Sequence, residues 1–347
     1  MITTQISVYR KQLMGIAALG VLFVHSMDII DCPDLFLSLF GYGGIGVYIF
    51  VFLSSIGLYC SLKSRGRGYK KSEFYKRRFQ RVFVPYLLIA ATWYGIKYLL
   101  IQQNPTGFFY ELSTLSFWID HQGAWYVAML VPVYLIFPLF YNWVEDGNRQ
   151  NKLTRNFRIA AVVVVSSIVT FILSILNPQV YSHLSQVFSS VIVYVIGYYC
   201  ADKVMAGKYN GNLISIICVI FYIVKAITPL KNFNFISSIS WSLLAIPIIT
   251  VSAWFLSKIK SRFIDSILGF FGKYSLEMYL WNIFLIQAIR YFGVINWLEK
   301  HGDSSGFVAY GLVVVGGIIL SIVYQKLSSY IVRKMNLKSL LRLRKGT

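Results

Sequence analysis

His25 ends an apolar run, 13–25, near the start of the chain. An ionisable side chain held in hydrocarbon costs a few kcal/mol, so it usually faces a protein cavity in which it has a function. Imidazole titrates near neutral pH and can take a proton from an alcohol and return it to a leaving group. We therefore predict that His25 is the catalytic base of a membrane enzyme. The alternative is that His25 forms a hydrogen bond that packs two helices together.

Asp28 follows His25 by three residues, which places the two side chains on one face of a continuous helix. Its carboxylate could accept the second ring N–H of the imidazole and so fix the tautomer. We interpret Asp28 as a catalytic partner of His25. The alternative is a carboxylate at the membrane interface, where the helix leaves the bilayer.

A second group that could do chemistry is the basic segment KRRFQRVFVPY at 76–86. Arg78 and Arg81 are one helical turn apart, and Arg77 lies beside them. Planar guanidiniums grouped where a helix enters the membrane can bind phosphate through paired hydrogen bonds. We predict that they bind a phosphate-bearing cytoplasmic substrate. The rest of the basic loop, from Lys63 to Lys76, is interpreted as setting topology and binding anionic lipid headgroups.

The composition indicates the class of protein that must position these residues. Of 347 residues, 57% are hydrophobic and only 13% are charged, whereas the surface of a soluble domain needs roughly twice that charge. We predict an all-α integral membrane protein in which about ten transmembrane helices form one bundle. The expected spans lie near 13–31, 45–62, 82–101, 123–142, 159–176, 187–201, 213–228, 239–257, 267–289 and 306–325.

The spacing of the spans favours a single membrane domain over 1–347, with a basic cytoplasmic tail at 325–347 and no appended soluble domain. The first apolar segment lacks a small-residue cleavage site, so we expect a retained helix and not a cleaved signal peptide. The four cysteines have no paired short spacing, and we expect neither disulfides nor a metal site from Cys32, Cys60, Cys200 and Cys218.

The net charge of +20 could suggest a nucleic-acid partner, but the distribution of the charge argues against one. Threading the spans in alternation leaves only five of the 33 Lys and Arg on the side opposite the N-terminus, namely Lys97, Lys225, Lys231, Arg290 and Lys300. This excess follows the positive-inside rule, so both termini are expected in the cytoplasm. The basic runs match the short cytoplasmic loops, which predicts contacts with membrane lipids and none with nucleic acid.

Five segments together resemble the acyltransferase-3 family of bacterial integral membrane enzymes, which O-acylate cell-surface sugars. They are GIAALGVLFVH ending at His25, GGIGVYIFVFLSS at 43–55, KRRFQRVFVPY at 76–86, AWYVAMLVPVYLIFPL at 124–139 and GKYSLEMYLWNIFL at 272–285. Each segment alone is a weak signal. Their order along most of the chain makes the resemblance specific.

Three positions depart from the family pattern. Members carry an Arg eleven residues before the histidine, where this chain has Met14, and Arg10, one turn nearer the cytoplasm, is the candidate to replace it. Ser54-Ser55 stands in place of a Ser-Gly pair, and Asn282 stands where members often have His. The last two departures are expected to change local packing or contacts with the acceptor.

The resemblance implies a membrane O-acyltransferase, specifically an O-acetyltransferase, of the bacterial inner membrane. Acetyl-CoA or another acyl-CoA would be the donor substrate, with no bound cofactor, and its phosphates would bind Arg77, Arg78, Arg81 and Arg10. The acceptor would be a hydroxyl of a surface glycan or lipid-linked oligosaccharide. Either His25 deprotonates this hydroxyl as it attacks, or an acyl-histidine intermediate forms, and both routes remain open.

Four further residues are candidates to bind the acceptor. His121, Trp125 and Tyr126 lie at an outer loop, the last two resemble a Trp-aromatic pair of the family, and aromatic faces suit sugar rings. The alternative for Trp125 and Tyr126 is an aromatic belt at the membrane boundary. Glu277 lies in a late apolar segment, where a carboxylate is usually functional. It could instead pair with Lys273, four residues earlier.

Two other functions compete with acyl transfer. A transporter or flippase for a lipid-linked sugar or small metabolite would use His25 as a proton relay, but the chain lacks inverted repeats and paired Gly/Pro-broken helices. A polysaccharide-export component without chemistry would retain its function in the His25→Ala variant.

Overall fold

The computed structural model describes residues 6–31, 33–66, 69–145 and 151–345, with side chains as far as Leu337. Every regular element within these residues is a helix, which confirms the prediction of an all-α protein. The chain divides into two compact units, each assembled from three separate stretches of sequence. Two helices, α1 (Arg10–Ser26) and α8 (Trp125–Val144), begin in one unit and end in the other.

Unit 1 comprises Met1–Val21, Tyr42–Tyr69 and Ile136–Lys273. Its helix α10 packs against α3, α9 and α12, and α11 packs against α13. The approach of α10 to α3 depends on Gly197, because a Cβ there would lie 2.1 Å from Ser55 Oγ and 2.8 Å from the Phe52 carbonyl oxygen. The elements wholly in unit 1 are η1 (Tyr42–Gly44), α3 (Ile45–Lys63), α9 (Lys152–Leu176), α10 (Pro178–Met205), α11 (Asn212–Ile227), η4 (Pro229–Asn232), α12 (Asn234–Leu243), α13 (Ala245–Ile259) and α14 (Arg262–Lys273).

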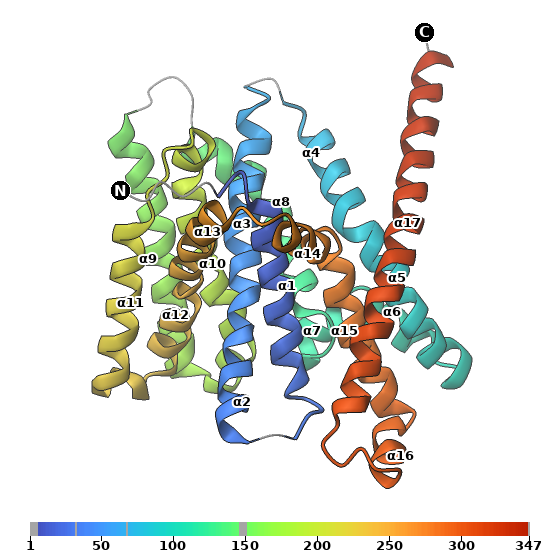
Figure 1. Cartoon of the computed structure of the whole chain (residues 1–347). Helices are drawn as coiled ribbons and strands as arrows, with labels where there is room; N and C mark the ends of the chain where they lie inside the picture. Colours follow the sequence, from blue (N-terminus) through green and yellow to red (C-terminus); the bar gives the residue numbers. More distant parts are fainter. Residues whose placement is uncertain (1–5, 32, 67–68, 146–150, 346–347) are drawn as a thin grey trace. The chain divides into compact units, whose positions relative to one another are not determined.

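Unit 2 comprises Leu22–Gly41, Lys70–Leu135 and Tyr274–Thr347. Its helix α15 packs against α17 and α5, which also contact each other (Figure 1). The elements wholly in unit 2 are α2 (Asp34–Gly41), α4 (Lys71–Arg78), the π-helix η2 (Phe79–Phe83), α5 (Val84–Tyr94), the π-helix η3 (Gly95–Ile101), α6 (Pro105–Leu112), α7 (Leu115–Asp120), α15 (Ser275–Tyr291), α16 (Val294–Lys300) and α17 (Phe307–Lys345).

Seven helical segments in the described chain are long and apolar enough to cross a bilayer, or eight if α15 and α16, which meet at a bend of 66°, form one span. They are Asp34–Lys63, Lys71–Ile101, Trp125–Val144, Lys152–Leu176, Pro178–Met205, Asn234–Ile259 and Phe307–Leu337. Two of the ten expected spans correspond to shorter helices, since α1 has 17 residues and α11 has 16. The span expected at 267–289 is interrupted, because α14 ends at Lys273 and α15 begins at Ser275.

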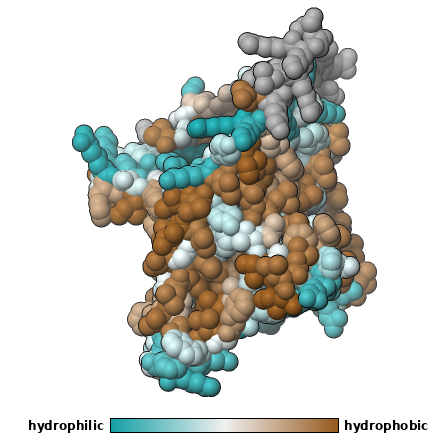
Figure 2. All heavy atoms as spheres, turned by 90° about the vertical axis from the view of Figure 1, so that its right-hand side faces the viewer, coloured by the Kyte–Doolittle hydropathy of each residue, from teal (hydrophilic) through white to brown (hydrophobic). Residues whose placement is uncertain are grey.

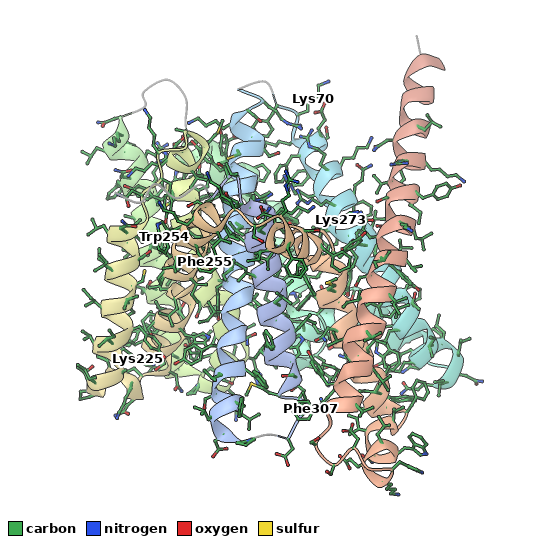
Figure 3. The ribbon with its side chains drawn as sticks, viewed as in Figure 1. Lys70, Lys225, Trp254, Phe255, Lys273 and Phe307 are labelled. Carbon is green, nitrogen blue, oxygen red and sulfur yellow. The ribbon has the colours of Figure 1, made fainter. Side chains whose placement is uncertain are left out.

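The exposed surface of these helices is that of a membrane protein. The most apolar span, Lys152–Leu176, is only 11% buried inside the protein. On α13, Trp254 and Phe255 are also exposed (Figure 3). The face drawn in Figure 2 is hydrophobic across its middle, and hydrophilic side chains gather towards its ends. Apolar surface of this extent is covered by lipid, so the chain is a multi-pass membrane protein.

Candidate active site

His25 belongs to a chain of hydrogen bonds within unit 2. The imidazole Nδ1 lies 2.6 Å from Oδ1 of Asn282, in the middle of α15. The Asn282 Nδ2 donates to the Tyr310 hydroxyl at 3.3 Å, and this hydroxyl donates to the Leu22 carbonyl oxygen. The end of α1, the middle of α15 and the first turn of α17 therefore supply one connected polar group to an otherwise apolar region.

The directions of these hydrogen bonds fix the tautomer of His25. A backbone carbonyl can only accept, so Tyr310 must donate its one proton to Leu22. The Tyr310 oxygen then accepts from the amide nitrogen of Asn282, which turns the amide oxygen towards the imidazole. Since that oxygen can only accept, Nδ1 of His25 carries the ring proton. Nε2 keeps its lone pair, and in the described part of the chain it has no hydrogen-bond partner.

The partner of Nδ1 differs from the one expected from the sequence. The expectation for Asp28 assumed that the helix continues past it, but α1 ends at Ser26. Asp28 lies in the following turn, where its carboxylate is exposed and its carbonyl oxygen accepts from Arg290. Asn282 orients the imidazole instead. Asn282 is a polar amide in an otherwise apolar segment, which was the signal in the sequence, and its burial, 1% exposed, is visible only in the structure.

An aromatic series links His25 to two of the acceptor-binding candidates. The Tyr279 ring lies 6.3 Å from the His25 ring and 5.8 Å from the Tyr126 ring, centroid to centroid. The Tyr126 N–H donates to the Tyr279 hydroxyl at 3.3 Å. The Trp125 ring meets Tyr126 edge-on at 6.2 Å. Tyr126 is only 8% exposed, which does not suit a lipid-facing belt residue.

His121 is held in a different setting from His25. It follows α7 with a positive φ of 59°, and its ring contacts Phe117 edge-on at 6.4 Å. A left-handed conformation is uncommon for a residue with a side chain. A role for His121 in binding the acceptor stays a prediction.

The basic cluster occupies the junction between α4 and the π-helix η2. Arg77 forms an ion pair with Glu73 at 3.6 Å, and the Arg78 guanidinium lies 5.4 Å from the centre of the Phe74 ring. Nε and Nη2 of Arg77 are buried and have no hydrogen-bond acceptor among the described residues. Arg77 and Arg78 are partly buried, whereas Arg81 is exposed.

The π-helix explains why Arg81 differs from its neighbours. Pro85 has no N–H to donate to the Arg81 carbonyl, and Val84 instead donates to Phe79, five residues earlier. A π-helical turn holds more residues than an α-helical turn. The α-helical spacing from which Arg78 and Arg81 were expected to share a face therefore does not apply through this segment.

Glu277 lies in the first turn of α15 and is only 6% exposed. The positive charge of Arg81 acts on its carboxylate. The alternative partner, Lys273, is in the preceding helix α14, so the two residues lack the continuous helical turn that an i,i+4 pair needs. The charge of Arg81 therefore acts on Glu277, and its role in binding the acceptor stays a prediction.

Arg10 belongs to unit 1. Its Nη2 donates to the Leu53 carbonyl oxygen at 3.3 Å, and a Cβ at Gly57 would lie 2.7 Å from the same nitrogen. The guanidinium therefore lies against α3, over a glycine that leaves room for it. Its role in place of an Arg at Met14 stays a prediction.

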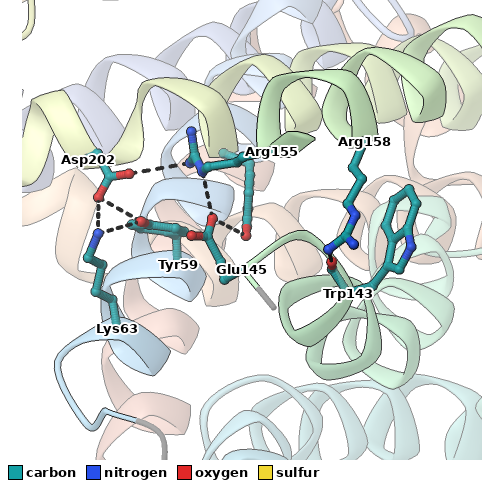
Figure 4. Close-up of polar contacts among 8 residues, drawn as sticks. Tyr59, Lys63, Trp143, Glu145, Arg155, Arg158 and Asp202 are labelled. Atoms are coloured by element: carbon teal, nitrogen blue, oxygen red, sulfur yellow. Dashed lines mark hydrogen bonds and ion pairs between the residues drawn. The ribbon is translucent and has the colours of Figure 1, made fainter. Parts of the chain in front are cut away.

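Unit 1 also contains a cluster of charges, of which Lys63 was expected only to set topology and bind lipid headgroups (Figure 4). Lys63 pairs with Asp202, which accepts from the Tyr59 hydroxyl at 2.6 Å. Arg155 pairs with Glu145 at 2.8 Å and with Asp202 at 3.3 Å. Two cations thus meet two carboxylates, which leaves the cluster neutral and suits a structural role that ties α3, α9 and α10 together.

The described residues contain no group of three or more His, Cys, Asp or Glu that could hold a metal ion. Cys60, Cys200 and Cys218 are free thiols. Cys32 lies outside the described residues.

Comparison with known proteins identifies a family that covers most of the chain. The family model of the acyltransferase domain, the acyltransferase-3 family, matches residues 12–326, which include parts of both units. No curated protein and no solved structure gives a significant match.

Proposed function

The chain belongs to the acyltransferase-3 family and is a membrane acyltransferase, and from this premise we propose that it transfers an acetyl group from acetyl-CoA to a hydroxyl of a surface glycan or lipid-linked oligosaccharide. The observation that carries the proposal is the hydrogen-bond chain from His25 through Asn282 and Tyr310 to Leu22. It supports a neutral imidazole whose Nε2 can act as a base.

The proposed reaction needs one base and one acid, and His25 supplies both in turn. As the acceptor oxygen attacks the thioester carbonyl, Nε2 takes the hydroxyl proton, and the collapse of the intermediate breaks the C–S bond. The imidazolium then returns the proton to the departing CoA thiolate. In the alternative route Nε2 attacks the thioester carbonyl, the C–S bond breaks and CoA leaves as a thiolate. The acceptor hydroxyl then attacks the acyl group, the C–N bond breaks to release the imidazole, and the hydroxyl proton passes to the CoA thiolate. In both routes Asn282 holds the ring in position through Nδ1.

The basic cluster is proposed to bind the phosphates of the donor. The unsatisfied N–H groups of Arg77, together with Arg78 and Arg81, offer charged donors suited to phosphate oxygens. These residues lie at the opposite end of the span Lys71–Ile101 from the loop that leads to Trp125. This separation suits a donor that approaches from the cytoplasm and an acceptor that approaches from outside.

The proposed topology has ten spans in one domain of the bacterial inner membrane. The seven segments, the bent pair α15–α16, α1 and α11 together make ten. Threading them in alternation puts most Lys and Arg on the side of both termini, which we propose is the cytoplasm.

Transfer of radiolabel from acetyl-CoA into glycan by membranes that express the protein tests the proposal. Wild type, His25→Ala and Arg78→Ala are compared at matched expression. We expect label in the wild type, at least a hundredfold less with His25→Ala, and a raised KM for acetyl-CoA with Arg78→Ala. No label in the wild type with its native glycan present, while glycan crosses the membrane only when the protein is expressed, would favour a transporter instead.

A further inference from the structure

Unit 2 contains a second buried polar group, around Glu111 in the last turn of α6. This carboxylate is 5% exposed, and its Oε1 accepts from the Tyr98 hydroxyl at 3.0 Å. The Tyr94 hydroxyl also interacts with this carboxylate. Its buried Oε2 nevertheless forms no hydrogen bond of ordinary geometry within the described residues, and none of their cations forms an ion pair with it. Because an unsatisfied buried carboxylate oxygen costs free energy, this atom calls for a donor from outside the chain.

Two other polar groups converge on the same place. Ser116, 2% exposed, also has a buried Oγ without a partner in the described chain. Gly123 has φ of +85°, and a Cβ there would lie 3.2 Å from the Tyr94 hydroxyl, 3.4 Å from Ser116 Oγ and 3.6 Å from Glu111 Oε2. Three oxygens thus surround the position that a Cβ would occupy at Gly123. We call Tyr94, Glu111, Ser116 and Gly123 the Glu111 cradle.

We propose that the Glu111 cradle binds a hydroxyl of the acceptor sugar, an inference that rests on the proposed function. A hydroxyl can donate to Glu111 Oε2 and accept from Ser116 Oγ, which satisfies both open atoms at once. An anionic ligand would be repelled by the carboxylate, and an ammonium group could donate to both oxygens but would leave the serine proton without an acceptor. A ligand with several hydroxyls fits the cradle better than either.

The position of the cradle in the fold suits an acceptor subsite. Gly123 leads directly into α8, and Tyr126 lies in the first turn of that helix. Tyr126 contacts Tyr279, whose ring faces His25. The cradle therefore lies next to the aromatic series that ends at the imidazole, within the same unit. Its role is to hold the acceptor and not to transfer protons.

Steady-state kinetics with acetyl-CoA and the native surface glycan test this assignment. The variants are Glu111→Gln, which keeps the size of the side chain, and Ser116→Ala, with Glu299→Gln as a control on an exposed carboxylate of α16. We expect the KM for glycan to rise roughly tenfold with Glu111→Gln and less with Ser116→Ala. The KM for acetyl-CoA should stay at the wild-type value in both variants, and Glu299→Gln should leave both KM values unchanged. An unchanged KM for glycan in both cradle variants would overturn the proposal. If Glu111→Gln does not fold, Ser116→Ala alone decides.

A binding measurement without acetyl-CoA separates this proposal from the proposed function. Saturation-transfer NMR on the detergent-purified full chain uses glucose, galactose and N-acetylglucosamine as probes. A sugar signal in the wild type and in Glu299→Gln that is lost in Glu111→Gln supports the cradle, even if no acetyl transfer is found and the proposed function fails. Acetyl transfer without any sugar signal, and with an unchanged KM for glycan in the variants, keeps the enzyme and overturns the cradle.

Discussion

The charged cluster of unit 1 and the polar groups of unit 2 differ in how completely they are satisfied. In unit 1, Lys63 and Arg155 each meet a carboxylate, and Tyr59 and Tyr198 donate to those carboxylates. In unit 2, the described residues leave His25 Nε2 and Glu111 Oε2 without partners. Arg155 Nη2 meets Asp202 at 3.3 Å as an ion pair without a hydrogen bond. Buried charges that face an opposite charge stabilise a fold, whereas open polar groups are available to a substrate. In this protein, a buried polar group is therefore a better candidate for function when it lacks a partner than when it is paired.

Arg155→Leu should give the largest effect on stability. It leaves Glu145, whose side chain is 9% exposed, without its cation, and the loss of one partner of a buried pair costs about 3 kcal/mol. We expect a lower melting temperature in detergent, with acetyl transfer per folded molecule unchanged. Adding Glu145→Gln removes the uncompensated charge and should recover part of the loss. An unchanged melting temperature in Arg155→Leu, or loss of acetyl transfer in a fully folded variant, would contradict a purely structural role for the unit 1 cluster.

Asn282→Leu should lower the catalytic rate of the folded protein, beyond any effect on its stability. Without the amide oxygen the imidazole loses its orientation and its tautomer preference, which costs about ten- to a hundredfold in kcat. The KM for acetyl-CoA should not change, because Asn282 is assigned to His25 and not to the donor. Asn282→Asp retains an acceptor oxygen and should keep more activity than Asn282→Leu. Equal losses in the two variants would argue that Asn282 only fills space.

Lys63→Gln should give the smallest effect. The Lys63 and Asp202 side chains are 42% and 38% exposed, and an exposed ion pair is worth only about 0.5 kcal/mol. Asp202 also keeps its contacts with Tyr59 and Arg155. We expect stability within about 0.5 kcal/mol of wild type and full transfer activity. A loss as large as that of Arg155→Leu would contradict the expectation that Arg155 stabilises the cluster more than Lys63 does.

The sequence predicted the fold class and the family because both depend on features that extend over the whole chain, namely apolar runs and the order of five segments. It failed where a single residue changes the backbone. Because α1 ends at Ser26, the helical spacing that predicted Asp28 on the face of His25 does not apply. The missing N–H of Pro85 accompanies a π-helix that changes the spacing of Arg78 and Arg81.

Contacts between segments that are distant in the sequence could not be predicted from residue spacing either. Asn282 lies 257 residues from His25, and without a fold nothing pairs them. The burial of Glu111 becomes visible only when α6, α7 and Gly123 are placed together. Local sequence alone was enough to predict that His25 lies within an apolar run and that Tyr126 lies at the end of a helix.

The ¹⁵N chemical shifts of the His25 ring test the central claim most directly. Of the four histidines in the chain, the His25 signals are identified by their loss in His25→Gln. In the full-length protein at pH 8, a proton on Nδ1 and a lone pair on Nε2 are predicted, with the proton moving to a mixture of the two nitrogens in Asn282→Leu. A proton on Nε2 in the wild type would contradict the assignment of that atom as the base.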